Sequence, residues 1–176
     1  MSSRNQQMRT FTLDRLAAPI GTMLVVTDGD GALRAIDWTE YESRMRRLLG
    51  RHYGEGRYTL RPGKMPKPVR AALSAYFGGD LAAIEALPVA TGGTPFQRDV
   101  WKALRTIPPG ETRSYSALAT TLGRPAAVRA VGLANGANPI GVVVPCHRVV
   151  GKNAALTGYA GGLERKRWLL AHEGVT

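Results

Sequence analysis

The chain has 176 residues, enough for one domain or two small ones, and 44% of them are hydrophobic, with three Trp, three Phe and six Tyr, as in an ordinary globular protein. It carries 24 Lys and Arg against 13 Asp and Glu, which gives a formal net charge of +11. Its single cysteine excludes an intramolecular disulfide and a cysteine-rich zinc site, and it fits a reducing compartment.

Membrane segments and metal sites have no signal in the sequence. It contains no apolar run of about 18 residues, and Met1–Gln7 lacks the apolar core of a signal peptide. The three histidines, His52, His147 and His172, do not have the spacing of metal ligands. We therefore expect a cytoplasmic protein without a bound metal and without a membrane partner.

The positive charge is concentrated in the second half of the chain. Residues 1–94 hold 13 basic and 9 acidic side chains, a net +4, which leaves 11 against 4, a net +7, for residues 95–176. Arginine outnumbers lysine, and its planar guanidinium suits contacts with phosphate. The excess favours a nucleic-acid partner, and the alternative is a basic surface that serves only solubility.

The first ninety residues predict a small α+β unit. Ile20–Thr27 and Ala32–Trp38 are typical strands, and Asp28–Gly31 between them is a hairpin turn signal. Helices are predicted over Glu40–Leu49 and over Pro68–Phe77, and nothing in this half indicates chemistry. The arginines of the first helix are interpreted as a solvated face, with DNA contact as the less favoured alternative: Arg44, Arg46, Arg47 and Arg51.

The middle of the chain predicts a linker, residues 91–94, between two domains, 1–90 and 95–176. A helix begins after the linker, because Thr94 and Gln97 match a capping box and a proline follows the cap. The apolar side chains that follow form one stripe, which is typical of core rather than of a cofactor site: Phe96, Val100, Trp101, Leu104 and Ile107.

Two short helices separated by a turn are predicted next. Ser114 can cap a segment that runs to Leu122, a Gly-Arg-Pro turn follows, and Ala126–Ala134 resumes the helix. This is helix-turn-helix spacing, which generic two-helix hairpins share. Arg129, the one charge of the second helix, is either a DNA contact or a solvent-facing residue. Several residues of this helix are small, which allows close approach to a partner: Ala126, Ala127, Ala130, Gly132 and Ala134.

The only cysteine, Cys146, directly precedes His147. A thiol attacks as its thiolate, which a neighbouring base or cation makes available, and the alternative is an inert cysteine after a buried strand over Ile140–Val144. Pro145 favours the reactive interpretation, because it ends that strand and leaves the thiol at an edge or turn. The polar side chains of His147 and Arg148 argue against a sealed apolar site. His147 reaches the sulfur only if the backbone turns or a water bridges them.

The residues around this cysteine resemble a known family. Pro145–Val149, with Asn138 and Pro139 upstream and Leu156–Gly162 downstream, is similar to the O6-alkylguanine-DNA alkyltransferases, also called methylated-DNA-protein-cysteine methyltransferases. The resemblance covers Thr94–Gly174 almost continuously, and the first ninety residues are most similar to the bacterial constitutive (Ogt-type) branch. It implies a mixed α/β (α+β) protein in which an RNase H-like sheet domain precedes a helix-rich winged helix-turn-helix domain.

The resemblance also implies the reaction, which is irreversible transfer of an alkyl group from O6 of guanine, and from O4 of thymine, in double-stranded DNA to Cys146. His147 would deprotonate the thiol through a water, and Glu173 would orient the imidazole, although by its position alone Glu173 is typical of a solvated helix end. Asn138 would hold the recognition helix and the cysteine segment in register. No cofactor is implied, and because a thioether has no easy leaving route, one molecule would repair one lesion.

The same resemblance implies how DNA is bound. The second helix would enter the minor groove, and Arg129 would replace a nucleotide that is rotated outward. Tyr115 would help to turn the target phosphate, its alternative being a core aromatic. Backbone groups near Val149 and Ala160 would hydrogen-bond the guanine, with Tyr159 as a wall of the pocket. The small residues placed against the groove would be Ala127, Ala130 and Gly132.

Three positions depart from the family pattern: Val128, Gly141 and Ala154. They bear on fit to the groove and on loop mobility rather than on the chemistry. We expect a monomer in solution, with cooperative assembly on DNA left open. The alternative function is a non-catalytic sensor of alkylated DNA or, more remotely, a winged-helix regulator. The retained cysteine favours transfer, because the sensor relatives replace it.

Overall fold

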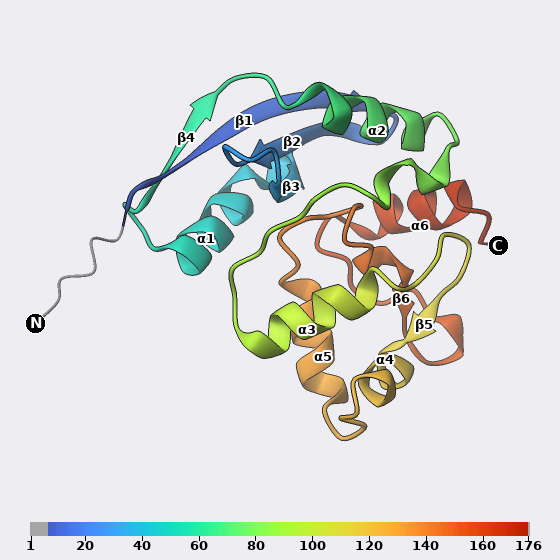
Figure 1. Cartoon of the computed structure of the whole chain (residues 1–176). Coiled ribbons are helices and arrows are strands. Elements are labelled where there is room, and N and C mark those ends of the chain that lie inside the picture. The colour runs from blue at the N-terminus through green and yellow to red at the C-terminus, as the bar shows by residue number, and fades with distance from the viewer. Residues whose placement is uncertain (1–6, 176) are drawn as a thin grey trace, which may run out of the picture.

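The computed structural model describes residues 7–175 and contains a four-stranded sheet in the first half of the chain (Figure 1). Residues 1–6, most of the segment compared with a signal peptide, and Thr176 lie outside the described part. Along the sheet the order is β3-β2-β1-β4, and β4 is parallel to β1 while the other pairs are antiparallel. The strands are β1 (Arg9–Ala18), β2 (Gly21–Thr27), β3 (Leu33–Trp38) and β4 (Tyr58–Pro62).

The predicted hairpin is confirmed as β2 and β3, whereas the sequence does not predict β1 and β4. In β1, Phe11 and Leu13 pack on one face of the sheet, and Leu16 belongs to the core on the other face. The apolar positions therefore change face within the strand, and the alternation that identifies a half-buried strand is lost. β4 is a short edge strand whose Tyr58 and Leu60 are only partly buried.

Helices cover both faces of the sheet. On one face, Met45 and Leu49 of α1 (Glu42–Tyr53) pack against the strands. A 3-10 turn (Thr39–Tyr41) precedes α1, so the helix begins two residues later than predicted and continues to Tyr53. The other predicted helix is confirmed as α2 (Lys67–Phe77), whose buried side chains join the main core. No helix within residues 7–175 combines the length and apolar content needed to cross a bilayer.

The second half of the chain is mainly helical (Figure 1). The predicted capping box is confirmed, because Gln97 N donates to Thr94 Oγ1 at 3.1 Å and Thr94 N donates to Gln97 Oε1 at 3.0 Å. Ser114 caps α4 as predicted, and α5 starts at Val128 rather than Ala126. A 3-10 turn (Leu81–Ile84) ends the first half, and the elements that follow are α3 (Pro95–Leu104), β5 (Arg113–Ser114), α4 (Tyr115–Thr121), α5 (Val128–Gly136), a 3-10 turn (Cys146–Arg148), β6 (Val149–Val150), a 3-10 turn (Lys152–Ala154) and α6 (Leu163–His172).

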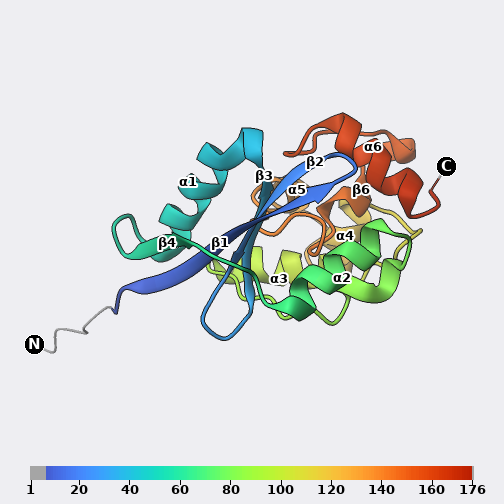
Figure 2. The ribbon, with the colours of Figure 1, turned by 90° about the horizontal axis from the view of Figure 1, so that it is seen from above.

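The two halves meet along β3, the edge strand opposite β4 in the sheet. Ile36 N donates to Pro139 O at 3.0 Å, and Gly141 N donates to Ile36 O at 3.2 Å. Leu33 forms a similar bridge with Val89. Seen from above, the sheet lies across the second half (Figure 2). One hydrophobic cluster continues through both halves and includes Met23, Val25, Tyr76, Trp101, Val131, Val144 and Leu169.

The segment before the cysteine is not the strand predicted over Ile140–Val144. Only its first residue makes a strand-like bridge, to Ile36, and the chain then turns. Val142 has φ +70° in a tight turn that is closed by a 2.8 Å bond from Val143 N to Gly141 O. A β-branched residue in this conformation is strained, by about 1–3 kcal/mol. The apolar run therefore reports burial correctly but not the backbone form, which tertiary contacts impose.

The segment from Gly151 to Gly162 contains no strand. The chain forms the 3-10 turn Lys152–Ala154 and then runs as a loop to Gly162. Asn153 and Ala154 have φ values of +60° and +59°, a conformation that glycine adopts most easily. The departure at Ala154 therefore places a side chain where the backbone favours glycine.

Candidate active site

Cys146 starts the 3-10 turn Cys146–Arg148 and is 6% exposed. It lies outside any strand ladder, as the preceding proline predicts. Burial raises the pKa of its thiol, and the Asn138 side chain and the charge of Lys166 act in the opposite direction. The position of the thiol is thus apolar but is reached by two groups that favour the thiolate.

The polar neighbours of the cysteine are buried together with a carboxylate. The expectation that they keep the site unsealed is wrong, because His147 is 0% exposed and Arg148 and Glu173 are each 4% exposed. His147 Nε2 donates to Glu173 Oε2 at 2.9 Å. Arg148 donates from Nε to Oε1 and from Nη2 to Oε2 of Glu173, both at 2.8 Å. Glu173 is therefore not the solvated end residue that its position alone suggests.

These contacts set the protonation states of the group. Burial lowers the pKa of His147, although its bond to Glu173 opposes the shift, so the ring is neutral at pH 7. Burial would raise the pKa of Glu173, but hydrogen bonds from Arg148 and His147 hold it well below its usual range. Because the proton on His147 occupies Nε2, the basic nitrogen is Nδ1, which has no hydrogen-bond partner among residues 7–175.

Asn138 holds the turn that leads to the cysteine. Its Nδ2 donates to Val144 O at 2.8 Å, and its Oδ1 accepts from Ile140 N at 3.0 Å. Both ends of the amide therefore bind backbone on either side of the strained turn. The side chain of Asn135, at the end of α5, also points to this segment, with Nδ2 3.5 Å from Cys146 O.

Lys166 is a buried cation to which the sequence analysis gives no role. It is 0% exposed, and its Nζ donates to Val149 O at 2.7 Å and to Thr157 O at 2.9 Å. Burial lowers its pKa, and a thiolate at Cys146 would raise it. Lys166 thus ties β6 to the following loop and presents positive charge to the sulfur.

Arg44 does not belong to the solvated face that is predicted for α1. Its Nη2 lies 2.5 Å from Asp37 Oδ1, its Nε donates to Asp37 Oδ2 at 3.0 Å, and its Nη1 donates to Ala160 O. An ion pair of the first half therefore holds the backbone next to Tyr159. Tyr159 is partly buried, and burial, followed by the charge of Cys146, raises its pKa. The remaining arginines of that helix are exposed, as predicted: Arg46, Arg47 and Arg51.

The predicted DNA-contacting residues lie outside the buried network, at the start of α4 and on α5 with the residue before it. Tyr115 begins α4, its hydroxyl accepts from Thr157 Oγ1 at 3.3 Å, and a Cβ at Gly132 would lie 3.8 Å from its ring. Leu133, one turn after Arg129, is 71% exposed. The predicted contacts are exposed or partly exposed: Ala127, Arg129, Ala130 and Gly132.

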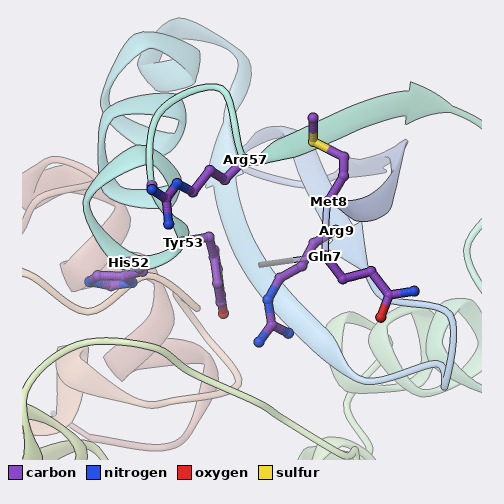
Figure 3. Close-up of a pocket in the computed structure, with 7 residues that line it drawn as sticks. Gln7, Met8, Arg9, His52, Tyr53 and Arg57 are labelled. Carbon is purple, nitrogen blue, oxygen red and sulfur yellow. The ribbon is translucent and has the colours of Figure 1, made fainter. Parts of the chain in front are cut away.

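A separate hollow of about 610 Å³ lies between the start of β1 and the end of α1 (Figure 3). Arg9, His52, Tyr53 and Arg57 line it, and none of the residues predicted for the site does. Burial, and then the charge of Arg51, lowers the pKa of His52, so this ring adds no charge at pH 7. The hollow is thus distinct from the group around Cys146.

Comparison with known proteins finds relatives of this chain. Residues 95–175 match the family model described as 6-O-methylguanine DNA methyltransferase, DNA binding domain. Over 161 residues the chain is 55% identical to the methylated-DNA-protein-cysteine methyltransferase of Salmonella typhimurium, a match that covers 92% of this chain and 94% of that protein. The chain belongs to the methylated-DNA-protein-cysteine methyltransferase family.

Solved structures of this methyltransferase family share the fold. Mycobacterium tuberculosis OGT in complex with DNA superposes with a TM-score of 0.73 at 39% identity, over 93% of this chain and 92% of that chain. The O6-methylguanine-DNA methyltransferase of Pyrococcus kodakaraensis gives 0.72 at 26% identity, over 94% and 99%. The mixed α/β architecture predicted from the sequence is therefore confirmed.

Proposed function

We propose that the chain repairs DNA by direct reversal, moving an alkyl group from O6 of guanine, and from O4 of thymine, to Cys146. The family name specifies a cysteine acceptor, and this chain has one cysteine. A bond forms between Sγ and the alkyl carbon while the bond from that carbon to O6 breaks. The electron pair stays with guanine, which takes up one proton in exchange for the proton that the thiol loses. The thioether has no easy leaving route, so each molecule reacts once and needs no cofactor.

The observation that carries the proposal is the buried pair of His147 and Glu173 directly after the only cysteine. His147 Nδ1 is the base, and it takes the thiol proton through a bridging water. The ring then becomes positively charged, and the carboxylate bonded to Nε2 stabilises that charge. Asn138 keeps the cysteine turn in place during this step.

The guanine pocket is proposed to use backbone groups that side chains hold from behind. The carbonyl of Val149 would accept from the guanine amino group, and its second lone pair is taken by Lys166 Nζ at 2.7 Å. The N–H of Ala160 would donate to O6, and Arg44 fixes the carbonyl of the same residue. Tyr159 would form one wall. The bonds from Lys166 to Val149 O and from Arg44 to Ala160 O are formed within the protein, so they do not depend on the base.

DNA is proposed to bind through α4 and α5 as a helix-turn-helix in a winged domain, residues 95–176, which follows an RNase H-like domain at 1–90 and a linker at 91–94. In this proposal α5 enters the minor groove, Arg129 fills the space of the extruded nucleotide and Tyr115 turns the target phosphate. The exposure of Arg129 and the net +7 of residues 95–176 support it. We propose that a monomer carries out the reaction.

The test is the mass of the intact protein after incubation with duplex DNA that contains O6-methylguanine. Wild type should gain about 14 Da, one methyl in place of one proton, on the tryptic peptide that contains Cys146. Cys146→Ser changes one atom and should bind the lesion without gaining mass, because a hydroxyl has a far higher pKa than a thiol. Wild-type protein that binds the lesion but stays unmodified after hours with excess DNA would overturn the proposal in favour of a lesion sensor.

A further inference from the structure

Tyr76 of α2, a residue of the sheet half, reaches the carboxylate of the candidate site. It is 0% exposed, and its hydroxyl donates to Glu173 Oε2 at 2.6 Å. Its backbone carbonyl accepts from His172 Nε2 at 2.7 Å, and the two rings pack edge to face with centroids 5.2 Å apart. His172 and Glu173, at the end of α6, therefore hydrogen-bond to the backbone and to the side chain of the same residue of α2.

The hydroxyl of Tyr76 shares its acceptor atom with the candidate base. Glu173 Oε2 receives three donors: Tyr76 at 2.6 Å, His147 Nε2 at 2.9 Å and Arg148 Nη2 at 2.8 Å. Oε1 receives one, from Arg148 Nε. A carboxylate oxygen that already accepts strong hydrogen bonds attracts a further proton less, so Tyr76 and His147 compete for the charge on Oε2.

We propose that Tyr76 is a positioning residue for alkyl transfer, which fixes Glu173 from the sheet half and limits how strongly this carboxylate stabilises a protonated His147. The inference rests on the proposed function, because it presumes that His147 takes the thiol proton. It assigns the sheet half a part in the chemistry, in contrast to the prediction that nothing in this half is chemical. A base can accept the thiol proton only while it is unprotonated, and Tyr76 keeps the pKa of His147 low enough for the ring to be unprotonated before the reaction.

The Tyr76 hydroxyl should lower the pKa of His147. Without the hydroxyl, Oε2 would carry more negative charge, its bond to His147 Nε2 would strengthen, and the pKa of His147 would rise. A larger fraction of His147 would then be protonated below neutral pH and unable to accept the thiol proton. The rate of transfer should fall on the acidic side and recover as the pH rises. A purely structural role would lower the rate by the same factor at every pH.

Tyr76→Phe removes the hydroxyl and keeps the ring, and single-turnover methyl transfer from duplex DNA is followed from roughly pH 5 to 9. We expect the acidic limb to move up by on the order of 0.5 pH unit, with a rate about three-fold lower below the limb and nearly unchanged above it. Tyr58→Phe is the matched control, because Tyr58 lies in the same half and its hydroxyl bonds to Arg46 O at 3.1 Å. Its profile should coincide with that of wild type. A uniform loss in Tyr76→Phe, or no shift, would overturn the inference.

Three further experiments separate the possible outcomes of this test. A ¹⁵N NMR titration of the histidine side chains reports the pKa of His147 directly, and it should rise in Tyr76→Phe. Placing 3-fluorotyrosine at position 76 makes the hydroxyl a stronger donor and should move the limb to lower pH, which also covers the case in which Tyr76→Phe does not fold. In the Glu173→Gln background, loss of the hydroxyl should shift nothing. Failure of wild type to transfer would contradict the proposed function, whereas normal wild-type transfer with unshifted variants would contradict this inference alone.

Discussion

The surroundings of Cys146 and the open surface of α5 differ in how their polar groups are satisfied. Glu173 accepts four hydrogen bonds from three side chains, and Lys166 donates to two carbonyls, all inside the protein. The side chain of Arg129 is exposed and forms no hydrogen bond or ion pair with the side chains or backbone of residues 7–175. Most polar groups of the first region are bonded within the protein, with His147 Nδ1 as an exception, whereas the proposed partners of the second region are groups of the DNA. Substitutions in the first region should therefore slow transfer from every alkyl donor, and substitutions in the second should slow transfer only from duplex DNA.

Arg148→Met should have the largest effect. Glu173 would lose two hydrogen bonds and the guanidinium that compensates its charge, and an uncompensated buried carboxylate costs on the order of 3–5 kcal/mol. The measurement is the free energy of unfolding in urea at pH 7. Arg167→Met, at an exposed position of α6, is the control and should change stability by less than about 0.5 kcal/mol. Equal losses would show that the buried network is no more important than the surface.

The same pair has a defined pH dependence. The pKa of Glu173 is held below its usual value near 4.5, so its carboxylate stabilises the folded protein at all higher pH. That contribution is lost as the pH falls from this value toward the lower pKa of the folded state. Wild type should therefore lose stability on acidification more steeply than Arg148→Met, in which the shift is smaller. Parallel curves would contradict this assignment.

Glu173→Gln should slow alkyl transfer by roughly 100-fold, because the imidazole loses both its orientation and the charge that stabilises its protonated form. The loss should be equal with duplex DNA and with free O6-benzylguanine, since both need the thiolate. Single-turnover rates with the two donors measure it. Mutant and wild-type rates that agree from roughly pH 6 to 9 would remove Glu173 from the mechanism.

Arg129→Ala tests the other side of the comparison. Repair of duplex DNA should fall by about 30-fold, because the extruded nucleotide is no longer replaced, while reaction with free O6-benzylguanine should stay within about two-fold of wild type. Arg47→Ala removes the same charge from an exposed position of α1 and should change neither rate. If both reactions of Arg129→Ala fell by the same factor, its proposed role would be wrong.

Lys166→Met should have the smallest effect on rate, about five-fold at pH 7. Burial already raises the pKa of Cys146, and without the nearby ammonium it should rise further. The deficit should therefore shrink as the pH increases, which alkylation of the thiol by iodoacetamide across pH can follow. Lys152→Met, at an exposed loop position, should match wild type throughout. A deficit that does not vary with pH would limit Lys166 to holding the loop.

The features that the sequence predicted correctly are local ones. The caps at Thr94 and Ser114 and the turn between β2 and β3 each depend on residues a few positions apart. The strand expected over Ile140–Val144 failed because its backbone is shaped by β3, far away in sequence. The family resemblance placed Glu173 beside His147, which composition alone could not.

Two of the side chains that sequence reasoning missed act across the two halves. The bonds from Arg44 to Ala160 and from Tyr76 to Glu173 span about a hundred residues, and no local pattern reports them. Lys166 did leave a signal. It precedes Leu169, Leu170 and Glu173 by three, four and seven residues, and all four are buried, so the helical period alone would have placed its ammonium inside the protein.

Because Ile36 bonds to the Pro139–Gly141 backbone, the turn that presents Cys146 can form only after both halves of the chain have been synthesised. The turn that presents Cys146 lies against a strand that leaves the ribosome about a hundred residues earlier, and Glu173, which bonds to His147, is synthesised after the cysteine. A nascent or unfolded chain therefore carries an ordinary thiol with an ordinary reactivity. In the proposed function the acceptor is spent by its first alkylation, and the pair that assists loss of the thiol proton, His147 with Glu173, is assembled only when the two halves of the fold have come together.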